Sequence, residues 1–258
     1  MEFAILCTLL LKMKEGSAFL KKFSACMVAA ATSIALLLVL GNSGTLPWFP
    51  PAVVFSLAGI CLAFGLVYPF IWHFREKKGR ASSDKIYGFI NTLIRYTIAF
   101  NLASFGWKKI FELQFIVPAS IAAKPMDQQS GEWLTWYYFG YSPAFGLILA
   151  FIQIAGAYFL LFRRTLLAAT LILFAFMLNL LFINIFYHMN AGALVQSILL
   201  TFGLTYIILS DYQRLKTFFF DSLPDIHFLT AKNSIAKNLI RLSAIVLSLL
   251  FVLYLKKS

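Results

Sequence analysis

Cysteine is scarce in this sequence, and the few that occur stand alone. Cys7, Cys26 and Cys61 are the only three in 258 residues, and none belongs to a CxxC pair. Isolated cysteines at these spacings do not supply the ligands of a structural zinc site or the framework of a disulfide-rich domain. The sequence therefore predicts neither a metal site nor a disulfide scaffold.

Acidic residues and histidines are also few, which limits the chemistry open to the chain. There are ten Asp and Glu and three His, and the sequence contains no Gly-rich phosphate loop, Ser-His-Asp order or carboxylate cluster. A transmembrane haem needs ligands at similar depth, but the topology below places His73 and His227 on one side and His188 on the other. Haem binding and autonomous hydrolysis are not indicated, and the catalytic residues, if any, are unknown.

Long hydrophobic runs dominate what is present. Hydrophobic residues make up 61% of the chain and charged residues 12%, with a mean hydropathy of +0.83, against roughly 45–50% and about 25% in soluble domains. The net charge of +12 comes mostly from Lys and Arg at the ends of apolar runs. This placement indicates headgroup contacts and topology signals rather than nucleic-acid binding, so the expected partner is the lipid bilayer.

Seven runs are long enough to cross about 30 Å of hydrocarbon as helices. They cover residues 23–40, 52–72, 86–106, 144–162, 166–187, 193–210 and 235–255. Residues 1–22 contain a run too short to cross, and we expect an interfacial segment there rather than a cleaved signal peptide. The predicted fold class is an all-α integral membrane protein with seven transmembrane helices.

The basic residues predict how these helices are oriented. Lys and Arg gather before the first run and between runs two and three, four and five, and six and seven, whereas "GNSGTLPWFPP" and "HMNAG" contain none. Because short basic loops stay in the cytoplasm, the N-terminus is predicted to be cytoplasmic. Lys108 and Lys109, just past the third run, are exceptions.

The connection from residue 107 to 143 is rich in aromatic residues, in particular in "GEWLTWYYFGYS". Trp and Tyr concentrate at the depth of lipid headgroups, so this stretch is expected to form an interfacial or re-entrant segment. Two interpretations stay open: an aromatic belt, or a lid over a ligand.

A set of ordered motifs resembles one family. "IRYTIAFNLASFGWKKIFELQF", "WYYFGYS", "LLFRRT", "NLLFINIFYH" and "SDYQRLKTFF" together resemble the DoxX-like family of bacterial membrane proteins, in its larger form with additional N-terminal spans. The matching positions are Arg95, Tyr96, Phe105, Gly106, Lys109, Gln114, Phe115, Gly140, Tyr141, Ser142, Arg163, Arg164, Thr165, Asn179, Asn184 and Tyr187.

The resemblance implies an architecture and a setting. It implies a four-helix core over residues 86–219 with the outer aromatic loop 107–143, two N-terminal helices and a basic loop over 23–85, and a C-terminal helix over 220–258. It also implies the bacterial cytoplasmic (inner) membrane, and some members are linked to quinone or to thiol-redox complexes. Relatives usually carry Glu, Asp and Lys where this chain has Gln153, His188 and Gly192.

Polar residues inside the predicted spans are candidate site residues. Arg95 lies mid-span, where a cation is costly, so it should face protein and find a partner such as Gln153 or Asn179. Asn184 and His188 are four apart and share a helix face, whereas Asn179 points elsewhere. Between membrane helices such amides are most often packing contacts.

These observations lead to two hypotheses. The first is a non-catalytic membrane component that binds a small hydrophobic ligand, or a membrane or periplasmic partner protein, on its outer face. The second is a membrane subunit of a quinone-linked oxidoreductase or thiol-redox complex; no cofactor motif is recognisable, and quinone is the candidate that the resemblance implies. The predicted outer cavity is bordered by Arg95, Lys109, Gln114, Trp133, Trp136, Tyr141, Gln153, Asn184 and His188.

Overall fold

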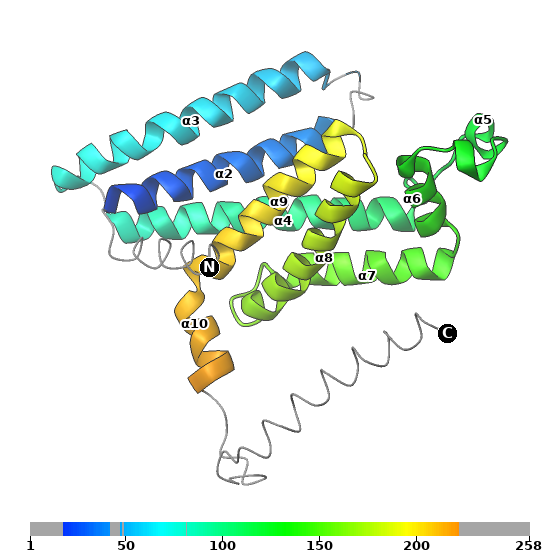
Figure 1. Ribbon diagram of the computed structural model, residues 1–258. Coiled ribbons are helices and arrows are strands. Elements are labelled where there is room, and N and C mark those ends of the chain that lie inside the picture. The colour runs from blue at the N-terminus through cyan, green and yellow to red at the C-terminus, as the bar shows by residue number, and fades with distance from the viewer. Residues whose placement is uncertain (1–17, 42–46, 48, 81, 222–258) are drawn as a thin grey trace, which may run out of the picture. The chain divides into compact units, whose positions relative to one another are not determined.

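The computed structural model describes residues 18–41, 47, 49–80 and 82–221 (Figure 1). These residues form helices and connecting loops, with no strand among them. The long helices are α2 (Ala18–Gly41), α3 (Pro51–Lys77), α4 (Ser83–Ile110), α7 (Pro143–Phe159), α8 (Leu166–Phe186) and α9 (Ala191–Ser210). Between α4 and α7 lie the short helices α5 (Ala119–Ala122), η2 (Met126–Gln128) and α6 (Gly131–Gly140).

The described chain divides into two compact units at Tyr212. All the helices above belong to the first unit. The short helix α10 (Tyr212–Lys216) starts at this boundary and is followed by the π-helical turn η3 (Thr217–Asp221).

Four helices are long and apolar enough to cross a membrane, namely α2, α3, α8 and α9. Helices α6 and α7 are together also long and apolar enough to cross a membrane, with a bend of 93° between them. If they form one broken span, the count rises to five. Helices of this length and composition indicate a multi-pass membrane protein. The prediction of an all-helical membrane protein is therefore confirmed at this level.

The predicted count of seven spans is not confirmed. The third predicted span lies in α4, which has 28 residues but is not among the helices apolar enough to qualify. The seventh, residues 235–255, lies outside the described residues, as does most of the interfacial segment predicted for residues 1–22. Several boundaries also differ from the prediction by a few residues; for example, the first helix is already formed at Ala18, α3 continues to Lys77 and α4 continues to Ile110.

The core of the first unit is formed where α2, α4, α7, α8 and α9 meet. Helix α2 packs against α3, α4 and α9, while α4 also packs against α7. The buried apolar side chains at these contacts include Ile94, Ile98, Leu102, Leu173 and Leu204. Helix α3 is different, because most of its large apolar side chains, among them Phe55 and Phe64, are exposed. An exposed apolar surface of this kind suits contact with lipid.

Glycines allow α4 and α9 to approach their neighbours closely. A Cβ at Gly106 of α4 would lie 2.4 Å from Cγ1 of Ile154 on α7. A Cβ at Gly203 of α9 would lie 2.7 Å from Cγ2 of Thr32 on α2. Small residues at such crossings are typical of helices that associate in membranes.

Parts of the first two predicted basic segments meet at one end of this unit, called here the basic end, where α2 begins, α3 ends and α4 begins. Lys22 near the start of α2 forms an ion pair with Glu76 near the end of α3. Trp72 Nε1 donates a hydrogen bond to Ser83 Oγ at the start of α4, at 3.1 Å. These contacts hold the start of α2, the end of α3 and the start of α4 together. The opposite end of the helices holds the candidate site.

Candidate functional site

A cavity of about 880 Å³ lies at the end of the helices opposite the basic end. Helices α2, α3, α4, α6, α7, α8 and α9 all contribute to its lining. Its apolar walls include Leu102, Phe105, Phe139, Phe145, Met177, Leu180 and Leu200. A volume of roughly 300–1,000 Å³ with mostly apolar walls and a few polar groups is typical of small-molecule sites.

Lys109 is the central polar group on one side of the cavity. Its ammonium group donates hydrogen bonds to Oε1 of Gln153 at 2.9 Å and to the carbonyl oxygen of Phe105 at 3.4 Å. It also lies 5.8 Å from the ring centroid of Phe115. Gln153 is buried, so this contact joins the last turn of α4 to the middle of α7.

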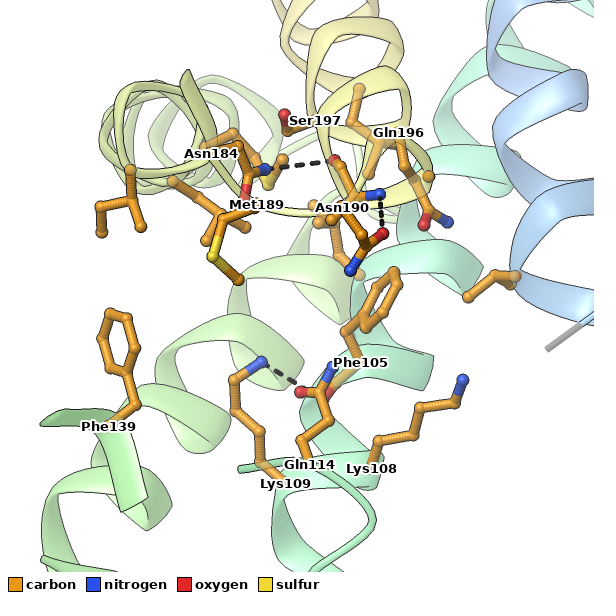
Figure 2. A pocket seen from close by; sticks show the side chains of 18 of the residues that line it. Phe105, Lys108, Lys109, Gln114, Phe139, Asn184, Met189, Asn190, Gln196 and Ser197 are labelled. Atoms are coloured by element: carbon orange, nitrogen blue, oxygen red, sulfur yellow. Dashed lines mark hydrogen bonds between the residues drawn. The ribbon is translucent and has the colours of Figure 1, made fainter. Parts of the chain in front are cut away.

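Gln114 and Lys108 stand beside Lys109 in the cavity lining. Figure 2 shows Lys108, Lys109 and Gln114 together on one side of the cavity, with Asn184, Asn190 and Gln196 across from them. The side-chain oxygen of Gln114 is buried and accepts no hydrogen bond within the described residues. Buried polar atoms are nearly always paired, so this oxygen is a candidate ligand contact.

The other polar side of the cavity is formed where α8 turns into α9. Asn184 Nδ2 donates to the carbonyl oxygen of Ala193 at 3.1 Å. The side-chain oxygen of Asn190 caps α9 by accepting from the backbone N–H of Ala193 at 2.9 Å. Gln196 Nε2 donates to Oδ1 of Asn101 at 3.1 Å. These amides already form hydrogen bonds with other groups of the protein. They therefore hold α8 and α9 in place more than they offer free contacts to a ligand.

Five of the nine predicted site residues line this cavity: Lys109, Gln114, Trp136, Gln153 and Asn184. The other four, Arg95, Trp133, Tyr141 and His188, do not line it. The cavity thus brings together predicted residues from α4, α7, α8 and the aromatic segment, whereas these four side chains lie outside its lining.

Arg95 lies toward the basic end and binds the backbone immediately after the C-terminus of α7. Its Nε donates to the carbonyl oxygen of Leu160 at 2.9 Å, and its Nη2 donates to that of Leu161 at 2.7 Å. The predicted partners were Gln153 and Asn179, and that expectation is wrong. The physical reason is that the last carbonyl groups of a helix have no partner within it and attract cations.

His188 does not share a face with Asn184, contrary to the prediction. Helix α8 ends at Phe186 with Tyr187 as its C-cap, and His188 takes a left-handed conformation with φ of 53°. The four-residue periodicity therefore no longer applies. Asn184 is buried in the cavity wall, while His188 is exposed.

The aromatic segment is a helix, α6, which turns by 93° from α7. Its Thr135, Trp136, Tyr138 and Phe139 face the cavity. Trp133 instead packs edge-on against Trp136, with ring centroids 5.9 Å apart. Tyr141 is 91% exposed, which suits an interfacial residue better than a lining residue.

Sequence reasoning missed several lining residues, most of them on α8 and α9. Gln196 and Ser197 are buried polar residues within an apolar run, which is the same signal that identified Asn184. Asn179 also lines the cavity, although counting residues around the helix placed it toward another neighbour. Aliphatic and aromatic wall residues such as Leu200 and Phe105 carry no separate signal in a sequence this apolar.

No family model, curated protein or solved structure matches this chain. The resemblance to the DoxX-like family therefore rests on the sequence motifs alone. Within the described residues, no group of three or more His, Cys, Asp or Glu is placed to hold a metal ion.

Proposed function

We propose that this protein is a membrane component that binds a small hydrophobic molecule in the cavity beside Lys109, without catalysing a reaction itself. The observation that carries the proposal is the combination of about 880 Å³ of mostly apolar space with a few polar groups on one side. Sites for small molecules usually have this composition. A partner protein on the outer face is less favoured, because a concave, mostly apolar surface suits a small ligand.

The proposal includes a membrane setting. The start of α2, the end of α3 and the start of α4 meet at the basic end through Lys22, Glu76 and Ser83. This arrangement agrees with one cytoplasmic side for the basic segments, a cytoplasmic N-terminus and an outward-facing cavity. The bacterial inner membrane, a seven-span topology and membership of the DoxX-like family complete the proposal, on the motifs given above.

Helix α6 is proposed to cover the cavity as a lid fixed at one end. A Cβ at Gly131 would lie 2.6 Å from the carbonyl oxygen of Tyr187, so α6 begins in close contact with the α8–α9 turn. Asn190 Nδ2 donates to Glu132 at 3.1 Å, which strengthens the same contact. If α7 crosses the membrane, its 93° bend directs α6 along the membrane surface, where its aromatic residues are stable.

Filling the cavity should abolish ligand binding. Ala193 is a small, half-buried lining residue, so Ala193→Phe should place a ring in the cavity. The purified full chain would be titrated with dibromostearyl alcohol and with decylubiquinone, both of which quench tryptophan when they bind next to it. Trp136 lines the cavity, whereas Trp72 and Trp107 do not, so Trp136→Phe should reduce the saturable part of the signal.

The matched control is Ala175→Phe, which adds the same ring at an exposed position of α8 outside the cavity. Saturable quenching in the parent and in Ala175→Phe, but not in Ala193→Phe, is the expected result. Quenching that never saturates, or that is equal in all three proteins, would reject the cavity as a ligand site.

A further inference from the structure

We infer that the cavity takes an acidic amphiphile, a molecule with an apolar tail and a carboxylate or phosphate head, and that the head binds at Lys109. This inference rests on the proposed function, because it names the class of ligand for the same cavity. It separates an anionic ligand from a neutral one such as a quinone.

The charge of the lining is the first argument. Among the described residues, the lining includes Lys108 and Lys109 but no Asp or Glu. The two hydrogen bonds of the Lys109 ammonium group go to the neutral oxygens of Gln153 and Phe105, and no carboxylate of the described chain forms an ion pair with it. A cation beside apolar walls is costly without a countercharge. An anionic head would supply that countercharge.

The orientation of the polar groups is the second argument. Lys109 reaches across to Gln153 on α7, and the cation of Lys108 lies 5.4 Å from the ring centroid of Phe105. Both lysines lie in the last turn of α4, next to the unpaired oxygen of Gln114 in the lining. An oxyacid head accepts hydrogen bonds from ammonium groups, while a hydroxyl group on the same head would donate to Gln114.

The apolar walls account for the tail. Phe176, Leu180 and Ile183 of α8 line the cavity and are half-buried, so part of each side chain is open to a ligand. They provide a dry surface away from the lysines, as an apolar tail requires. The ligand thus places its head at the end of α4 and its tail between α4, α8 and α9.

The test compares ligands that differ only in the head. Dibromostearate, dibromostearyl phosphate and dibromostearyl alcohol share one tail, and each would be titrated into the purified full chain while the quenching of its tryptophan fluorescence is followed. We expect at least one acid to bind about tenfold more tightly than the alcohol, the effect of one hydrogen bond to a charged group. The acid with the lower Kd identifies the head as carboxylate or phosphate.

Two variants test the role of Lys109 in opposite ways. Lys109→Gln removes the cation, and Gln153→Glu supplies an internal countercharge at the atom that Lys109 already contacts. Both should weaken the acid about tenfold and leave the Kd of the alcohol within about twofold. The alcohol titration also reports whether each variant is folded.

Lys124→Gln is the matched control, since Lys124 is an exposed lysine outside the cavity. It should keep the preference of the parent. Equal binding of acid and alcohol by the parent, or an unchanged preference in both Lys109→Gln and Gln153→Glu, would overturn the inference while the proposed function stands. If none of the three ligands gives saturable quenching, the proposed function fails as well.

Discussion

Replacing Glu76 with alanine is expected to lower the stability of the purified protein more than any other substitution considered. Lys22 is 1% exposed, and Glu76 is its ion-pair partner. Without Glu76 a buried ammonium group would keep only the ring of Trp72, 5.5 Å away. Breaking a buried pair on one side typically costs 3–5 kcal/mol. Because the Glu76 side chain is 35% exposed, we expect about 3 kcal/mol, the lower end of that range.

A double-mutant cycle checks this prediction through the thermal unfolding midpoint in detergent. Lys22→Met combined with Glu76→Ala should be more stable than Glu76→Ala alone, since no charge is then left buried. Trp72 and Ser83 join the same cluster through their own hydrogen bond, so they are kept unchanged. If the double variant is no more stable than Glu76→Ala, the pair does not account for the loss.

Replacing Arg95 with leucine is expected to have the second largest effect. Arg95 supplies two charge-assisted hydrogen bonds to the carbonyl groups of Leu160 and Leu161, immediately after the C-terminus of α7. Each hydrogen bond to a charged group contributes roughly 1.5–3 kcal/mol. Two such bonds would contribute about 3–6 kcal/mol when fully buried, and because Arg95 is only half-buried we expect a smaller total loss of about 2–3 kcal/mol.

A second variant, Arg95→Lys, tests how much of this effect comes from the charge alone. Lysine keeps the charge but not the planar, forked arrangement of donors, so it should recover part of the loss. Both variants would be compared with the parent by thermal unfolding in detergent. Because Arg95 does not line the cavity, neither variant should change the Kd of the brominated ligands. A changed Kd without a stability loss would return Arg95 to the list of binding residues.

The sequence predicts the helices well because their signals are local. Long apolar runs and the basic residues between them place α2, α3, α8 and α9 within a few residues. The signal is weaker for α4, where Asn91, Arg95 and Asn101 lower the hydropathy of a helix that the structure places in the core. The sequence signal also does not predict the bend between α6 and α7, because the hydropathy of a segment does not show in which direction its helix axis points.

The candidate site was predictable where a polar residue lies within a regular helix. Lys109, Gln153 and Asn184 follow helical periodicity, and all three line the cavity. His188 does not, because the helix ends two residues before it, and such boundaries are the least certain part of a sequence-based prediction. The partner of Arg95 was missed for another reason, since backbone carbonyl groups do not appear in a sequence pattern.

The most direct test of the cavity as a ligand site is photo-crosslinking followed by mapping of the labelled peptides. The full chain in lipid nanodiscs would be labelled with a stearate analogue that carries a diazirine on its tail, with and without excess unlabelled stearate. We predict labelling around Leu180, Met189 and Leu200 that the competitor removes, together with labelling of the exposed residues of α3 that it does not remove. Labelling confined to α3, or cavity labelling that the competitor leaves unchanged, would contradict the account.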